Sequence, residues 1–166
     1  MNNKLNIKAM ENLKLAKSTA KKLFPDAPEW FKTVLVSTFG KDISKKRNFT
    51  DIKTYEDAID EMPIDEENII YQTDSVDIIA YKKLKHIIKV VNGPDFIVDW
   101  TNGNQKKWYP WFNILPSGFG FSDSSYRCTH SATAVGSRLC LESDEKATHM
   151  GTQFTNLYEL FITIKN

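Results

Sequence analysis

The period of the apolar residues changes part-way along this chain, and this change limits the fold more than any other feature. Before Asn92-Gly93-Pro94 the apolar residues recur about every 3.6 positions, and after it they alternate. The first period is typical of amphipathic helices and the second of half-buried strands. Because the helices precede the strands instead of alternating with them, the sequence predicts an α+β fold.

The first part of the chain carries the start and stop signals of four helices. Pro25 ends the first helix, Asp26 is the expected N-cap of the second, and Gly40 its expected C-cap. Thr54 is the expected cap of a short helix, and Ser75 of a long one. We therefore expect helices at 5–24, 27–39, 54–62 and 76–91.

The later part predicts a small antiparallel sheet that a helix covers. We expect about four strands, at 96–100, 107–114, 119–129 and 133–142, with the last two forming a hairpin. Pro110 indicates an edge position or a bulge in the second of these strands. Ser143 is the expected N-cap of a final helix at 144–161, whose apolar stripe predicts packing on the sheet.

The chain's 166 residues suit a single domain, in which we expect a helical subdomain 1–50, an acidic connecting segment 51–74 and an α+β core 75–166. The net charge of +1 is unevenly spread. Residues 1–50 carry 11 Lys/Arg and 4 Asp/Glu, whereas residues 51–77 carry 1 and 10. The basic N-terminal third indicates either contact with an acidic partner or pairing with the acidic segment of the same molecule.

The sequence shows neither a membrane span of roughly 20 apolar residues nor the apolar core of a secretory signal in residues 1–24. We therefore expect a cytoplasmic protein that contacts no membrane. Cys128 and Cys140 are then expected to be reduced, although a hairpin would also allow a disulfide between them. Together with His130 and His149 they are the one set with zinc-binding chemistry, but they lack two closely spaced ligand pairs. No metal or cofactor is expected.

The strongest local signal is a run of aromatic residues beside basic ones. We expect Trp108, Tyr109 and Trp111 to sit close to three cationic residues, Lys106, Lys107 and Arg127. If one face of this strand is exposed, its rings would stack on the bases of single-stranded nucleic acid or anchor a protein partner. The alternative is that helices cover both faces of the strand.

Arg138 is a further candidate binding residue. On a strand, its guanidinium would hold a carboxylate or a phosphate through two hydrogen bonds. The alternative is a structural ion pair with Glu142 or Asp144.

No motif in the chain predicts catalysis. Gly118-Phe119-Gly120 lacks the third glycine and the following helix of a dinucleotide fingerprint, and Ser137 lacks an identifiable base. The acids of 51–77 have no apolar surroundings that would shift their pKa values. We therefore expect a binding protein and not an enzyme.

A set of ordered motifs runs across residues 50–161. They are Tyr55-Glu56-Asp57-Ala58, Ile79-Ala80-Tyr81-Lys82-Lys83-Leu84, Asp99-Trp100-Thr101-Asn102, Lys107-Trp108-Tyr109-Pro110-Trp111-Phe112, Gly118-Phe119-Gly120-Phe121-Ser122, Val135-Gly136-Ser137-Arg138-Leu139-Cys140, Gln153-Phe154 and Leu157-Tyr158. Together these motifs resemble a widespread family of uncharacterised small proteins from Bacteroidota genomes, their phages and mobile elements. In that family Tyr usually stands where this chain has Trp108, and Phe or a similar residue where it has Leu141.

The resemblance implies a phage or mobile-element origin and no reaction. Taken with the residues above, it favours a protein that binds a host or phage macromolecular machine, for example as an anti-CRISPR-like inhibitor of a host defence nuclease. A module that binds RNA or single-stranded DNA is the alternative, and a virion or assembly protein a further one. The sequence leaves the partner and the oligomeric state open.

Overall fold

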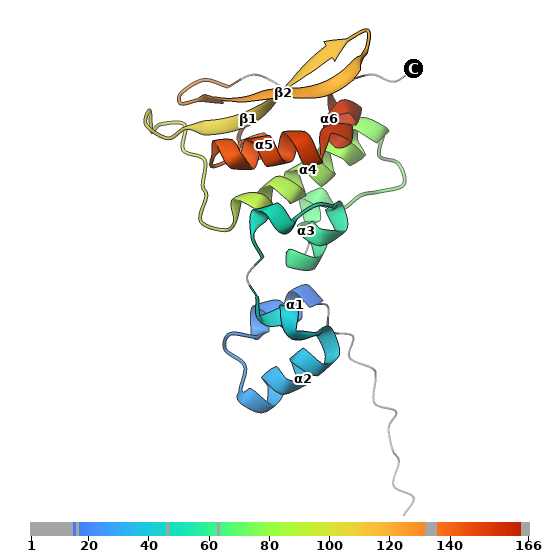
Figure 1. Ribbon diagram of the computed structural model, residues 1–166, viewed down its shortest axis with the longest axis vertical. Coiled ribbons are helices and arrows are strands. Elements are labelled where there is room, and N and C mark those ends of the chain that lie inside the picture. Colours follow the sequence, from blue (N-terminus) through green and yellow to red (C-terminus); the bar gives the residue numbers. More distant parts are fainter. Residues whose placement is uncertain (1–14, 16, 46, 63, 132–135, 164–166) are drawn as a thin grey trace, which may run out of the picture. The chain divides into compact units, whose positions relative to one another are not determined.

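A computed structural model describes residues 15, 17–45, 47–62, 64–131 and 136–163 (Figure 1). The chain divides into two compact units, residues 1–45 and 46–166. Within the described residues, no helix is both long enough and apolar enough to span a bilayer.

The first unit contains α1 (Lys17–Leu23), α2 (Glu29–Phe39) and a 3₁₀ turn, η1 (Lys41–Ser44). Ala20, Leu35 and Ile43 form its buried core. Residues 5–14 and 16 of the first predicted helix lie outside the described residues. α2 begins later than predicted, because Pro28 and not Asp26 is its N-cap, and no side chain caps it. Gly40 ends α2 with a φ of 87°, which glycine adopts readily.

The second unit opens with η2 (Phe49–Asp51), α3 (Tyr55–Glu61), η3 (Glu66–Asn68) and α4 (Val76–Asn92). The predicted cap of α3 is confirmed. Thr54 accepts a hydrogen bond from the backbone of Asp57, and the Asp57 carboxylate accepts one from the backbone of Thr54. Ser75 precedes α4, but its side chain caps no helix amide. Gly93 ends α4 with a φ of 80°.

The acidic segment forms its ion pairs within the second unit. Lys82 Nζ lies 2.7 Å from an Asp74 oxygen, and Lys89 Nζ lies 2.6 Å from an Asp65 oxygen. The bond from Lys82 lowers the pKa of Asp74. Arg47 lies 3.4 Å from Asp57. The lysines of α4 are thus the main partners that the structure shows for the acids of 65–74.

The sheet is a single antiparallel hairpin of β1 (Lys107–Leu115) and β2 (Gly118–Arg127). Among the described residues it has two strands, so the prediction of about four is wrong. Ser122 is an extra residue in β2, because Asp123 pairs with Trp111 while Phe121 pairs with the next residue, Phe112. The turn at residues 116–117 lies between the predicted strands 107–114 and 119–129.

Residues 96–100 form no strand, although their apolar residues alternate. The side chain of Gln105 forms hydrogen bonds with their backbone: it accepts one from the amide of Asp99 and donates one to the carbonyl of Ile97. Asp99 then accepts from the amide of Thr101, 2.8 Å away, and turns the chain. These side-chain hydrogen bonds replace the strand ladder that the sequence predicted.

Residues 133–142 also fail to form the predicted strand, as far as they are described; 132–135 lie outside the described residues. Residues 137–139 form the 3₁₀ turn η4 (Ser137–Leu139), and only Leu141 pairs with β1, through Trp108. On the other side of this segment, the side chain of Asn92 donates to the carbonyl of Cys140 and accepts from the amide of Glu142. An asparagine side chain thus stands where a further strand would pair.

The C-terminal helix is broken into α5 (Asp144–Gln153) and α6 (Thr155–Ile162). Ser143 caps α5 as predicted, and the break is at Phe154, whose ψ is 25°. Figure 1 shows α5 lying along the hairpin, with α4 beyond it. A Cβ atom added at Gly151 would lie 2.2 Å from the Phe121 ring, so α5 approaches the sheet closely. The prediction that the C-terminal helix packs on the sheet is therefore confirmed.

Candidate binding groove

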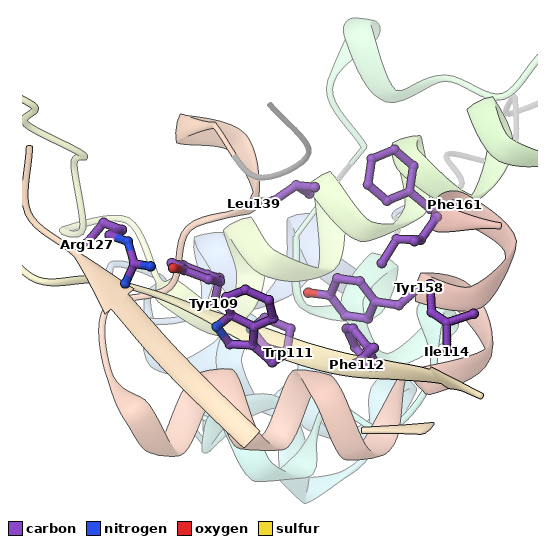
Figure 2. A pocket seen from close by; sticks show the side chains of 10 residues that line it. Tyr109, Trp111, Phe112, Ile114, Arg127, Leu139, Tyr158 and Phe161 are labelled. Atoms are coloured by element: carbon purple, nitrogen blue, oxygen red, sulfur yellow. The ribbon is translucent and has the colours of Figure 1, made fainter. Parts of the chain in front are cut away.

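An apolar groove of about 280 Å³ lies between β1 and α6, and we name it the β1–α6 groove (Figure 2). Its walls come from the hairpin, from η4 and from α6, which the break at Phe154 separates from α5. The lining residues are Tyr109, Pro110, Trp111, Phe112, Ile114, Arg127, Leu139, Tyr158, Phe161 and Ile162.

The edge of β1 that faces away from β2 is paired at one end only. The amide of Trp108 donates to the carbonyl of Leu141 at 2.9 Å, and the amide of Leu141 donates back at 2.8 Å. Backbone groups point alternately to the two edges of a strand, so those of Phe112 and Ile114 point to the same edge as those of Trp108. Among the described residues no strand pairs with that edge beyond Leu141.

The open part of the strand is also exposed. The side chain of Trp111 is 50% exposed and that of Ile114 is 63% exposed. Beneath them the Phe112 ring packs against the Tyr158 ring, with centroids 4.7 Å apart. The Tyr158 hydroxyl is buried without a hydrogen-bond partner among the described residues, and burial raises its pKa. The groove therefore combines apolar surface with backbone groups that pair with no other described residue.

Arg127 supplies a positive charge at one end of the groove. Figure 2 shows Arg127 and Tyr109 at one end and Ile114 at the other. The guanidinium lies 5.9 Å from the centroid of the Tyr109 ring. It donates a hydrogen bond, 2.9 Å long, to the backbone carbonyl of Tyr126, which precedes Arg127 in the chain. No carboxylate of the described residues forms an ion pair with it. The charge is thus available to an acidic ligand.

Two of the predicted binding residues are buried. Lys107 is 0% exposed, and its ammonium donates to the carbonyls of Cys128 at 2.6 Å and Asn102 at 3.2 Å. Lys107 thus links the loop before β1 to the loop after β2. The prediction that its side chain contacts a partner is wrong, because that side chain is buried. Tyr109 lines the groove but is only 8% exposed, and it has little free ring area on which a base could stack.

Trp108 and Lys106 belong to another surface. The Trp108 ring packs on the main core and lies 4.8 Å from the ring of Tyr126. The Lys106 ammonium lies 4.5 Å from the Tyr126 centroid and 5.7 Å from that of Trp108. Neither residue lines the β1–α6 groove.

Arg138 lies in η4, not on a strand, and lines a separate polar pocket of about 260 Å³ beside Lys85 and Lys89. Among the described residues, neither predicted partner, Glu142 or Asp144, forms an ion pair with Arg138. Glu142 pairs with Lys146, and Asp144 accepts a hydrogen bond from Ser124. Arg138 and Arg127 therefore belong to different sites.

The four candidate zinc ligands are not brought together. His149 bonds the carbonyl of Ile52 at 2.9 Å, and His130 bonds the neighbouring Thr129. Cys140 donates to the carbonyl of Gly136, and burial raises its pKa to about 11. Both cysteines are free. Within the described residues, no group of three or more His, Cys, Asp or Glu side chains is placed to hold a metal ion.

Sequence reasoning found Trp111 and Arg127 but missed the α6 wall of the groove. Tyr158 and Phe161 lie in the predicted final helix, whose apolar stripe predicts packing on the sheet and no groove. The available signal was Ile162, an apolar residue beyond the predicted end of that helix. Comparison with known proteins adds no relative, because no family model, curated protein or solved structure matches this chain.

Proposed function

We propose that this chain is a non-catalytic binding protein that holds apolar side chains of a protein partner in the β1–α6 groove. One observation carries the proposal: an apolar groove that exposes a tryptophan and ends at an arginine that pairs with no carboxylate of the described residues. Tryptophan and arginine are enriched among the residues that dominate the energy of protein interfaces.

The resemblance to phage and mobile-element proteins supports a partner in the host or phage machinery. A host defence nuclease, bound and inhibited in the cytoplasm, is the concrete form that we propose. Such an inhibitor needs a stable interface and no reactive centre, which agrees with a groove formed by apolar side chains.

Affinity capture with matched variants tests this proposal. Wild-type protein should recover one partner in a fixed ratio from lysate of the host. The double variant Trp111→Ala with Ile114→Ser should lose that partner, because both side chains are exposed within the groove. Ile97→Ser is the control, since Ile97 is an exposed apolar residue that does not line the groove. Equal recovery by the double variant would refute the proposal.

A single-stranded nucleic-acid module is the second candidate, favoured by Lys106 above the ring of Tyr126, which is 40% exposed. Exposed rings beside cations bind bases by stacking and bind phosphates by charge. The test is binding of a labelled polythymidine oligonucleotide at rising salt. This function predicts affinity that falls with salt and that Tyr126→Ala weakens about tenfold. No binding at low salt would remove it.

A further inference from the structure

The open edge of β1 points to the form of the partner. An unpaired edge is a template for another strand, and proteins usually block such edges with proline, charge or a covering segment. Here Leu141 covers the edge at Trp108, and Pro110 lacks the amide that would donate to a neighbouring strand. Phe112 and Ile114 keep both backbone groups, and both residues line the groove.

An extended polypeptide chain would pair with the backbone groups of the β1 edge and would also fill the apolar space of the groove. Its backbone would pair with Phe112 and Ile114, while alternate side chains would point to opposite sides of the new strand. One set of side chains would enter the apolar space beside Tyr158 and Phe161, and the other would face solvent. A hydrocarbon chain would fill the apolar space but would leave the backbone groups of the edge unpaired.

The positive charge of Arg127 favours an acidic group at one end of the bound chain. Arg127 forms no ion pair with a described carboxylate and lies at the Tyr109 end (Figure 2). An acidic side chain or a terminal carboxylate at that end would accept charge-assisted hydrogen bonds from the guanidinium.

We propose that the groove binds an extended segment of a protein partner as an added strand on β1, with an acidic group at Arg127. The segment spans about five residues, the length of the stretch from Pro110 to Ile114 against which it would pair. This inference rests on the proposed protein-binding function and adds the conformation and the charge of the bound segment.

The direct test uses short capped peptides of alternating valine and threonine, one set with a terminal glutamate and a matched set with a terminal glutamine. Nuclear magnetic resonance of the labelled protein reports the affinity and the exchange of each amide. The glutamate peptides should bind about tenfold more tightly. The Phe112 and Ile114 amides should become protected, since they would donate to the peptide. Peptides with N-methylated backbones should lose that protection.

Two pairs of variants separate the backbone contact from the charge contact. Ile114→Pro removes the amide and Ile114→Thr keeps it, so the proline variant should bind about tenfold more weakly than the threonine variant. Arg127→Gln should abolish the preference for glutamate. Arg138→Gln is the matched control and should leave the preference unchanged, because Arg138 lines a different pocket.

Strand addition is refuted if no peptide perturbs residues 110–114, or if peptides or laurate bind there while the Phe112 and Ile114 amides stay unprotected. The proposed function can survive that result, because a captured partner that still depends on Trp111 would show a groove used in another way. Loss of the Trp111 dependence would instead refute the proposed function.

Discussion

The two halves of β1 both carry large aromatic side chains, but their surroundings differ. In the first half, Lys107 and Tyr109 are buried, and Leu141 pairs with Trp108. In the second half, Trp111 and Ile114 are exposed beside an open edge. The difference indicates that the aromatic residues of a strand are accessible to a partner only where the rest of the chain leaves them uncovered. The following predictions test this difference, from the largest expected effect to the smallest.

Truncation to alanine should change the free energy of unfolding by different amounts at Tyr109 and at Trp111. Tyr109→Ala should lower the free energy of unfolding by about 4 kcal/mol, because it removes a buried ring and leaves a cavity. Trp111→Ala should lower it by about 1 kcal/mol, because half of its surface is already in water. Urea denaturation measures both values. Equal losses would show that the two halves are covered alike.

Lys107→Ala should lower the free energy of unfolding by about 3 kcal/mol, since it leaves the carbonyls of Asn102 and Cys128 without their donor and opens a cavity. The neighbouring exposed lysine provides the control. Lys106→Ala should change the free energy of unfolding by no more than about 0.5 kcal/mol. A Lys107 variant as stable as the wild type would mean that this side chain is not buried.

Asn92→Ala should lower the free energy of unfolding by about 2 kcal/mol, because it removes both hydrogen bonds that hold residues 140–142 beside β1. Asn113→Ala, at an exposed asparagine of the second half, should have little effect. Thermal unfolding followed by circular dichroism compares them. Matching transition temperatures would contradict the role given to Asn92.

The Cys140 thiol should lower the free energy of unfolding by about 1 kcal/mol as the pH rises from roughly 8 to 10. Burial raises its pKa from 9.0 to about 11, so the unfolded chain loses this proton first. Stability therefore falls as pH rises through the unfolded pKa. Denaturation of the wild type and Cys140→Ala isolates this slope. Identical slopes would place Cys140 in contact with water.

Local signals in the sequence were enough to predict much of the helical structure. Thr54 and Ser143 cap helices because the amides that they accept from lie three residues away in the same turn. β1 was predicted from alternation, with Pro110 at the unpaired edge as the rules for proline require. These features depend on neighbours in sequence.

The wrong predictions depend on groups that lie outside the predicted strands. Residues 96–100 and 140–142 alternate as strands do, but the side chains of Gln105 and Asn92 occupy their backbone groups. The burial of Lys107 follows from carbonyls on two separate loops. Of the groove, the sequence indicated Trp111 and Arg127 from residue type alone. For the opposite wall, formed by α6, the sequence held one signal, the apolar Ile162 beyond the predicted end of the final helix.

Amide hydrogen exchange of the free protein tests the central claim most directly. The account predicts that the amide of Trp108 is protected by its bond to Leu141, whereas those of Phe112 and Ile114 exchange nearly as fast as in an unstructured peptide. Strong protection at Phe112 and Ile114 would show that another part of the chain already covers this edge, and would contradict a binding groove there.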